Sequence, residues 1–391
     1  MKLRTYDPAP LLAELEERGL RRRRRRVQRL SHDTAEIELD GRPCVDFCSN
    51  DYLGLAAHPR VTAALVEAAR EHGVGARASH LVSGHQGEHE ALEEELAAFT
   101  GRERALLFST GYMANLGLAT ALVTKGGTVV GDALNHASLI DAGRIARATI
   151  DWYAHGDAEA LEAKLAACGA GRAVVMTDGV FSMDGDLAPL PALAAACERQ
   201  GAFLAVDDAH GLGVLGEGGG GTLEHFGLAA REVPALVGTL GKAFGSFGAF
   251  VAGDADLVET LVQRARTYIY TTALPVAIAA ATRAALAVSI SESWRRTRVL
   301  ALTRRFRALA AEAGIPLAAS ETPIQPVLIG GADDAVAASR RLLERGYYVA
   351  AIRPPTVPDG SSRLRVALSA AHRDADVEGL VVSLAEILSR G

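Results

Sequence analysis

The sequence predicts an α/β protein whose mostly parallel sheet is covered by helices, followed by a smaller α+β domain. Short apolar segments alternate with helical patterns between about residues 104 and 237, as is typical of a parallel sheet with crossover helices. After residue 272 the alternation stops, and a long helical region precedes a second set of strands and helices. We therefore expect an N-terminal helix and hairpin over residues 1–48, a large domain over 49–287 and a small α+β domain over 288–391.

The N-terminal elements follow from local patterns. Leu11–Leu20 is amphipathic and predicts a short helix that leads into six consecutive arginines, Arg21–Arg26. By itself such a run indicates a solvated face, and the alternative is an anion-binding arm. The segment AEIELDGRPCVDF alternates around Asp40-Gly41, which predicts a hairpin. Helices are expected over Pro59–His72 and Glu88–Phe99.

Five predicted strands end in polar or reactive side chains. They span residues 104–108, 128–131, 173–177, 202–206 and 233–237, and they are followed by STGYMAN, DALNHAS, DGVFSMDGD, DDAHG and GTLGK. Parallel strands present their carboxyl ends at one edge of a sheet, which is where open α/β sheets bind ligands. Five such endings predict a functional site at that edge.

The C-terminal part has a different pattern. A helical region runs to about Ala313 with a break at Ser291–Trp294. The remaining elements are expected to be strands at Ile324–Leu328, Tyr347–Ile352 and Arg363–Ala367, and helices at Ala335–Arg345 and Asp374–Ser389.

The composition excludes several classes of protein. A net charge of −6 gives no reason to expect nucleic acid or an anionic membrane as a partner. The four cysteines have no C-x-x-C spacing, so we expect neither a metal site nor a disulfide framework. The first thirty residues lack the apolar core of a signal peptide, and the apolar stretch Ala273–Ile290 is interrupted by Pro275 and Arg283. We expect a cytoplasmic protein that does not enter a membrane.

One lysine is set apart from the other basic residues. Of 41 Lys+Arg, lysine occurs only at Lys2, Lys125, Lys164 and Lys242. Lys242 follows an apolar strand, and lysine is the cation that can lose its proton and attack a carbonyl. The alternative interpretation is a lysine that binds phosphate or forms a salt bridge on a glycine-rich turn.

Two glycine motifs suggest other functions for this part of the chain. Gly211–Gly216 matches the GxGxxG motif of dinucleotide-binding proteins. A dinucleotide site requires a helix after this motif, whereas here the glycines Gly218–Gly221 follow. An NAD-linked oxidoreductase is therefore kept only as the alternative from a different class of enzyme. Gly241-Lys242 resembles a phosphate-binding loop, but Ala243 stands where Ser or Thr must reach Mg²⁺, which rejects that assignment.

The same strand ends meet the requirements of pyridoxal phosphate (PLP). The cofactor needs a lysine that reacts with its aldehyde and a carboxylate beside its pyridine nitrogen, and Lys242 and Asp207 can supply these. Its phosphate needs N–H groups at a helix start, which Gly111 and Tyr112 can provide, and Thr239 can add a hydroxyl.

Three further side chains can surround the cofactor ring. His136 can stack on its face, and Ser182 and His210 can reach its phenolic oxygen. Each histidine taken alone is more often structural than functional.

The sequence resembles a known family, the α-oxoamine synthases of the fold-type-I PLP-dependent transferases. The resemblance covers nearly the whole chain and rests on FCSNDYLGL, ALLFSTGYMAN, LNHASLIDAG, DGVFSMDGDLAPL, VDDAHGLGVLGEGG, GTLGKAFGSFG, TYIYTTALP and AIRPPTVPDGSSRLRVALSAAH. The AIRPPTVP segment favours the member that condenses L-alanine with a pimeloyl thioester, carried by CoA or an acyl carrier protein. The alternative within the family is a glycine C-acetyltransferase.

The resemblance also implies roles for individual residues. Lys242 would carry the cofactor, Asp207 would pair with the pyridinium, His136 would stack on the ring, and Ser182 and His210 would lie near its oxygen. The Gly111 and Tyr112 amides and Thr239 would hold the phosphate, together with Thr272 from the second subunit of a homodimer. The substrate residues implied are Arg365 for the amino-acid carboxylate, Asn50 near the reacting acyl group, and Arg21, Arg353 and Thr356 along the acyl site.

Two segments depart from the family pattern. Asp178 stands where glutamate is more frequent, and Ala76-Arg77-Ala78 replaces a glycine-rich segment. Both departures concern the loops near the acyl site.

Overall fold

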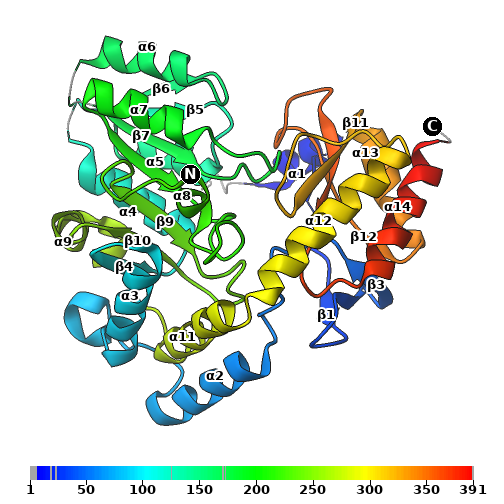
Figure 1. Ribbon diagram of the computed structural model, residues 1–391, viewed down its shortest axis with the longest axis horizontal. Coiled ribbons are helices and arrows are strands. Elements are labelled where there is room, and N and C mark those ends of the chain that lie inside the picture. Colours follow the sequence, from blue (N-terminus) through cyan, green and yellow to red (C-terminus); the bar gives the residue numbers. More distant parts are fainter. Residues whose placement is uncertain are drawn as a thin grey trace, which may run out of the picture.

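The computed structural model describes residues 7–17, 20–22, 24–124, 126–169, 171 and 173–389. Two lobes are visible, with helices α11 (Val276–Ser291) and α12 (Trp294–Glu312) running between them (Figure 1). The chain bends by 69° between these two helices, at the break predicted from the sequence.

The large lobe is built on a seven-stranded sheet with the order β4-β10-β9-β8-β7-β5-β6. Six strands run in the same direction, and β10 is antiparallel to both of its neighbours. The mostly parallel sheet predicted from the sequence is therefore confirmed. The strands are β4 (Arg104–Phe108), β5 (Thr128–Asp132), β6 (Thr149–Tyr153), β7 (Ala173–Asp178), β8 (Phe203–Asp207), β9 (Ala235–Thr239) and β10 (Ala249–Gly253).

Helices cover both faces of this sheet because neighbouring strand residues point to opposite faces. In β8, Leu204 and Val206 pack into one buried cluster and Ala205 packs into the other. A strand that is buried on both sides has no polar face, which explains its continuous apolar sequence. The helices of this lobe are α2 (Pro59–His72), α3 (Gly87–Thr100), α4 (Gly111–Leu122), α5 (Ala137–Ile145), α6 (Ala158–Cys168), α7 (Leu190–Gln200), α8 (Gly221–Phe226), α9 (Ala255–Arg264) and α10 (Arg266–Ile269), with a π-helical turn at His80–Gly84.

The small lobe contains two further sheets. One is antiparallel with the order β11-β14-β13, and the other has the order β1-β2-β3-β12. Its elements are α1 (Ala9–Glu17), β1 (Val27–Arg29), β2 (Glu36–Leu39), β3 (Arg42–Asp46), β11 (Ile324–Gly330), α13 (Ala332–Glu344), β12 (Tyr347–Tyr348), β13 (Ala350–Ile352), β14 (Ser362–Ala367) and α14 (Asp374–Leu388).

The predicted N-terminal hairpin is present as β2 and β3, and it pairs with the C-terminal part of the chain. Strand β12 lies parallel to β3, so segments about 300 residues apart form one sheet. The prediction of a single strand at Tyr347–Ile352 is wrong, because this segment divides at Val349 into β12 and β13. Tyr347 and Tyr348 join the hairpin, whereas Ala350–Ile352 pairs with β14.

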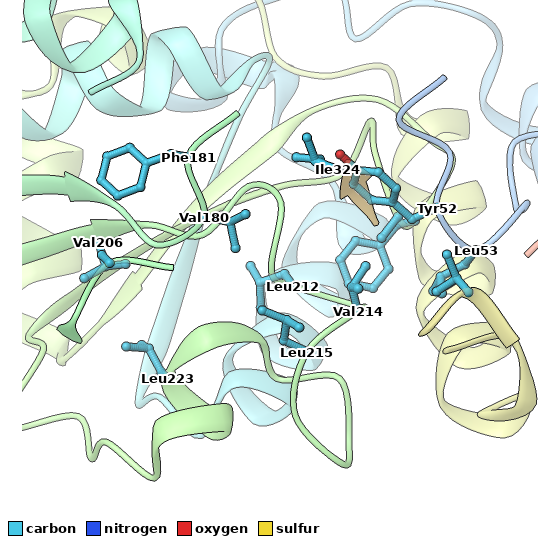
Figure 2. Close-up of a cluster of buried hydrophobic side chains, with 14 of the residues drawn as sticks. Tyr52, Leu53, Val180, Phe181, Val206, Leu212, Val214, Leu215, Leu223 and Ile324 are labelled. Carbon is cyan, nitrogen blue, oxygen red and sulfur yellow. The ribbon is translucent and has the colours of Figure 1, made fainter. Parts of the chain in front are cut away.

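The two lobes share one continuous core. Tyr52, Leu53, Val214 and Ile324 belong to the same cluster of buried side chains, although Ile324 begins β11 of the small lobe (Figure 2). This shared core fixes the C-terminal residues against the carboxyl edge of the large sheet.

In the described part of the chain, no single helix has the length and apolar content required to span a membrane, and one sharply bent pair, α11 with α12, meets those criteria only when joined.

Candidate active site

The five strand ends singled out in the sequence meet at one edge of the large sheet. Strands β4, β5, β7, β8 and β9 run in the same direction, so their carboxyl ends lie together. The prediction of a shared edge is confirmed. The predicted ends of four of these strands were placed too early, since β5 extends to Asp132, β7 to Asp178, β8 to Asp207 and β9 to Thr239.

Lys242 lies in the tight loop between β9 and β10. Its half-buried side chain places Nζ 3.1 Å from Nε2 of His210. Burial lowers the pKa of Lys242, and the negative charge of Asp207 is the largest effect that opposes this shift. A buried amine with a lowered pKa carries a reactive lone pair more readily than a surface lysine.

Asp207 ends β8 and is 6% exposed. One carboxylate oxygen accepts a hydrogen bond from Nδ2 of Asn115 at 2.6 Å, and the other accepts from the amide of Ala209 at 3.0 Å. Asn115 lies on α4 and also donates to Oγ of Ser138 at 2.9 Å. These contacts fix the orientation of the Asp207 carboxylate at the edge of the sheet.

His136 caps the N-terminus of α5. Its ring Nδ1 lies 2.8 Å from Oγ of Ser138, and its backbone N–H donates to a carboxylate oxygen of Asp178 at 2.6 Å. Burial lowers the pKa of His136, whereas the charge of Asp207 opposes this shift. A neutral ring held at both the backbone and the side chain is suited to stacking on a planar ligand.

The start of α4 forms an anion-binding cradle. Thr110 caps the helix by accepting from the amide of Met113 at 3.2 Å. The N–H groups of Gly111 and Tyr112, at the first turn of the helix, have no acceptor within the helix. A Cβ on Gly111 would lie 2.8 Å from Cγ2 of Thr239, so the Thr239 side chain closes the cradle.

The side chain of Tyr112 serves a different contact. It is 42% exposed, and its hydroxyl donates to the carboxylate of Asp141. Only the backbone of Tyr112 therefore contributes to the cradle within a single chain.

Arg365 brings the small lobe to the same edge. It is 7% exposed, its Nε donates to the carbonyl of Ser182 at 2.6 Å, and its terminal nitrogens donate to Oδ1 of Asn50 at 3.2 and 3.3 Å. The guanidinium is thus held in place from both lobes. Bidentate recognition of a carboxylate is the contact for which this planar group is best suited.

A cavity of about 1050 Å³ opens beside Ser182. Its lining includes Leu20, Leu134, Met183 and Thr356, so it joins the N-terminal segment, the large lobe and the segment after β13. Thr356 is therefore placed on the cavity, as the resemblance implied.

The resemblance also implied Arg21 and Arg353 for the acyl site, and Thr272 for the cofactor phosphate of a second subunit. Arg21 follows Leu20 and forms a surface ion pair with Glu16 at 2.9 Å. Arg353 precedes the proline pair of the cavity wall but does not belong to the residues that line it. Thr272 is exposed and pairs with Ser79, so its role toward a second subunit stays a prediction.

Four side chains at the site had no role in the sequence analysis. Asn115 and Ser138 link Asp207 to His136, Asp178 holds the His136 backbone, and Tyr52 contacts His210. Asn115 lies one helical turn after Gly111, and that spacing was a signal for a side chain on the same face of α4. The others depend on contacts between distant segments.

The GxGxxG segment does not form a dinucleotide site. Residues 211–216 form turns, and the next helix, α8, begins only at Gly221. This structure agrees with the sequence argument against an NAD-binding fingerprint.

The residues at this edge fit PLP. Lys242 presents an amine, Asp207 a fixed carboxylate and His136 a ring, while Gly111 lacks the Cβ that would crowd Thr239 at the helix start, where a phosphate can bind. Fold and site together define a PLP-dependent enzyme of the aminotransferase class I and II family, whose model matches residues 42–384.

Within this class, the chain belongs to the 8-amino-7-oxononanoate synthases. It is 58% identical to the 8-amino-7-oxononanoate synthase of Methylococcus capsulatus, over 98% of each chain, and 58% identical to that of Thioalkalivibrio sulfidiphilus, over 96% of each chain.

Solved structures share the same fold. A crystal structure of 8-amino-7-oxononanoate synthase from Francisella tularensis has a TM-score of 0.78 and 29% identity, covering 89% of this chain and 98% of that chain. The serine palmitoyltransferase of Sphingomonas wittichii reaches a TM-score of 0.92 with 32% identity, over 98% of this chain and 97% of that one. PLP is bound in a related serine palmitoyltransferase from S. paucimobilis, with a TM-score of 0.92 and 29% identity over 98% and 96% of the two chains.

Proposed function

We propose that this enzyme condenses L-alanine with a pimeloyl thioester to form 8-amino-7-oxononanoate. The acyl group leaves its thiol, the alanine carboxylate leaves as CO₂, and a new bond joins the alanine Cα to the acyl carbon. The names of the relatives support the product. The buried guanidinium of Arg365 and the cavity beside Ser182 support the two substrates.

Lys242 is proposed to hold the cofactor and to act as the base. When bound, PLP supplies an electron-withdrawing ring that stabilises negative charge on the amino-acid Cα. Asp207 keeps a negative charge beside the position of the pyridine nitrogen, and Asn115 fixes that carboxylate at 2.6 Å. The lowered pKa of Lys242 favours the free amine that accepts the Cα proton.

The remaining cofactor contacts come from residues whose positions are now defined. The amides of Gly111 and Tyr112 and the hydroxyl of Thr239 are proposed to bind the phosphate, and His136 to stack on the ring. A positively charged helix terminus favours a phosphate dianion at this point.

Arg365 is proposed to bind the alanine carboxylate. Its guanidinium is buried and held by Ser182 and Asn50, so it needs little reorganisation to make a bidentate contact. Fixing the carboxylate also fixes the direction of the Cα–H bond relative to Lys242. The group that is later lost as CO₂ is therefore the group that orients the substrate.

The cavity beside Ser182 is proposed to take the acyl chain. Its volume of about 1050 Å³ far exceeds the needs of a two-carbon acetyl group, which favours a pimeloyl donor over the acetyl donor of a glycine C-acetyltransferase. Arg21 and Arg353 directly neighbour Leu20 and Pro354 of the cavity lining and are proposed to select the terminal carboxylate of the chain or the carrier of the thioester.

A homodimer is proposed to complete the site. Thr272 is exposed on the single chain and would reach the phosphate of the second subunit. Other members of the fold are related to this chain over their full length, which supports a shared assembly.

The direct test is product analysis with matched substrates. The purified enzyme is incubated with PLP, L-alanine and either pimeloyl-CoA or pimeloyl-carrier protein, and the ketone product and CO₂ are quantified by mass spectrometry. We expect equal amounts of 8-amino-7-oxononanoate and CO₂, and a loss of about 10²–10⁴-fold or more in Lys242→Ala. Preferential turnover of glycine with acetyl-CoA would instead assign the alternative activity.

A further inference from the structure

A continuous chain of hydrogen bonds connects the guanidinium of Arg365 to the amine of Lys242. Arg365 contacts Oδ1 of Asn50 at 3.2 Å, and the same oxygen lies 3.2 Å from the hydroxyl of Tyr52. The Tyr52 hydroxyl lies 2.6 Å from Nδ1 of His210, whose Nε2 lies 3.1 Å from Nζ of Lys242. Asn50 and Tyr52 lie two residues apart, so three of the four hydrogen bonds depend on a single short segment.

The chemistry of each group sets the direction of every bond. A guanidinium has donors only, so the Asn50 atom that faces Arg365 must be the amide oxygen. That oxygen can only accept, so the single proton of the Tyr52 hydroxyl points toward Asn50. Tyr52 then has only lone pairs left for His210, which must donate from Nδ1.

This order leaves one arrangement for the imidazole. A neutral histidine carries one N–H, so protonation at Nδ1 leaves a lone pair on Nε2, and that lone pair accepts a hydrogen bond from Lys242. Burial, together with the positive charges of Lys242 and Arg365, lowers the pKa of His210 well below its ordinary value. The neutral ring assumed in this argument is therefore the stable form.

Tyr52 keeps its proton throughout the working range of pH. It is fully buried among apolar side chains that include Leu53 and Val214 (Figure 2). Burial raises the pKa of Tyr52 to about 12. The amide oxygen of Asn50 is a poor base. The row of hydrogen bonds therefore fixes where each proton lies and does not conduct protons to solvent.

We propose that Tyr52 is a positioning residue that holds His210 in its Nδ1–H tautomer and thereby couples carboxylate binding at Arg365 to the proton affinity of Lys242. The inference rests on the carboxylate role proposed above for Arg365. It gives Tyr52 a role at the site. It also links Arg365, proposed to bind the substrate carboxylate, to Lys242, proposed to accept the Cα proton.

The coupling follows from competition for the guanidinium. A bound carboxylate takes the Arg365 N–H groups that Asn50 now accepts, so the Asn50 amide is released from its fixed orientation. Tyr52 is then free to donate to Nδ1 of His210 instead, which favours the Nε2–H tautomer and removes an acceptor from Lys242. Because linkage is reciprocal, the protonation state at Lys242 must change the affinity for the carboxylate by the same factor.

Other titratable and charged groups face the same atoms and are unchanged in every variant. Around Lys242 and His210 they are His136, Asp178, Asp207, Asp208 and Arg365. Replacing Tyr52 by phenylalanine removes one hydroxyl and leaves all of these groups in place.

The first test uses propionate, a carboxylate without the amine, on the enzyme before PLP is added, because PLP would convert the Lys242 amine that contacts His210. The affinity for propionate is measured by calorimetry across a range of pH in wild type, Tyr52→Phe, Asn50→Ala and the control Tyr153→Phe. Tyr153 is a buried tyrosine at the end of β6, outside the chain of bonds. We expect a propionate affinity that changes about fivefold or more across the titration in wild type and the control, and a change near onefold in Tyr52→Phe and Asn50→Ala.

The second test observes the tautomer directly. Histidine labelled with ¹⁵N reports protonation of each ring nitrogen by NMR, before and after loading with PLP. Before loading, we expect His210 to be protonated at Nδ1 and bare at Nε2 in wild type, and to lose that preference in Tyr52→Phe.

The outcomes separate this inference from the role of Arg365. An unchanged tautomer and unchanged propionate coupling in Tyr52→Phe would overturn the inference while leaving carboxylate binding intact. Unaltered propionate binding in Arg365→Lys would contradict the proposal that Arg365 binds the carboxylate, and the proposed coupling would fail with it. Loss of coupling in Tyr52→Phe and in Asn50→Ala, with propionate still bound, supports the inference.

Discussion

Asp178 and Asp207 end neighbouring parallel strands and are direct partners in the register of the sheet. Two carboxyl groups in this position repel one another when both are ionised. Burial and the charge of Asp207 raise the pKa of Asp178 well above its ordinary value. We therefore expect the pair to divide its tasks: Asp207 is proposed to face the cofactor nitrogen, while Asp178 accepts the N–H of His136.

This division predicts different effects for two substitutions of Asp178. Asp178→Asn keeps an oxygen that can accept the His136 N–H and mimics a protonated carboxyl, so we expect turnover within a few-fold of wild type. Asp178→Ala leaves that partly buried N–H without its partner, and because a fully buried unpaired N–H costs about 1–3 kcal/mol, we expect the loss in unfolding free energy not to exceed that range. Denaturant unfolding and steady-state rates check both. Equal loss in the two variants would mean that the charge of Asp178, not its acceptor oxygen, is needed.

The phosphate cradle predicts a specific effect of adding one methyl group. In Gly111→Ala, the new Cβ would lie 2.8 Å from Cγ2 of Thr239, so the cradle must widen. We expect PLP to dissociate about tenfold more readily, equivalent to about 1.4 kcal/mol. Gly87 is the matched control, since it is also the first residue of its helix and has open space around it. PLP affinity by fluorescence should be unchanged in Gly87→Ala, and equal affinities in both variants would place the phosphate elsewhere.

The amine of Lys242 predicts the pH dependence of cofactor loading. Only the free amine reacts with an aldehyde, and burial lowers the pKa of Lys242. The loading rate should thus rise with pH and level off below the ordinary range of lysine. The negative charge of Asp207 opposes the effect of burial, so Asp207→Asn should move the midpoint to still lower pH. Stopped-flow absorbance measures both midpoints.

A surface carboxylate provides the control for that measurement. Asp151 pairs with Lys164 at 2.7 Å on the outside of the lobe, and Asp151→Asn should leave the loading midpoint of Lys242 where it is. A midpoint that rises in Asp207→Asn would contradict the assigned electrostatics.

His155 predicts a pH-dependent contribution to stability. Its ring bridges Asp132 and Asp186, at 2.9 Å on each side, and hydrogen bonds to these carboxylates raise the pKa of His155 to about 10. A raised pKa in the folded state means that the stabilisation is complete below the ordinary histidine value of about 6.5 and is lost as pH rises to about 10. His155→Gln should remove this part of the pH dependence, with a slope of at most about 1.4 kcal/mol per pH unit.

Chemical denaturation at a series of pH values tests the role of His155. His225 is exposed and serves as the control, since His225→Gln should retain the wild-type pH dependence. If His155→Gln keeps the full fall in stability between neutral pH and about pH 10, another group is responsible.

Much of the cofactor site could be predicted from the sequence because its residues follow strand ends. A parallel sheet brings those ends to one edge whatever the details of packing. Lys242, Asp207, His136 and Gly111 each lie within a few residues of such an end, so local pattern and topology together were enough to group them.

The sequence alone thus predicted the sheet, Lys242 as the candidate cofactor lysine and Asp207 as the candidate carboxylate for the pyridine nitrogen. Tertiary structure decided the contacts made across long separations: the contact of Tyr52 with His210, the Asn115 bridge to Asp207, and the pairing of the N-terminal hairpin with β12. The physical reason is that strand and helix patterns repeat over a few residues, whereas hydrogen-bond direction in a buried site depends on which distant groups the fold brings within about 3 Å.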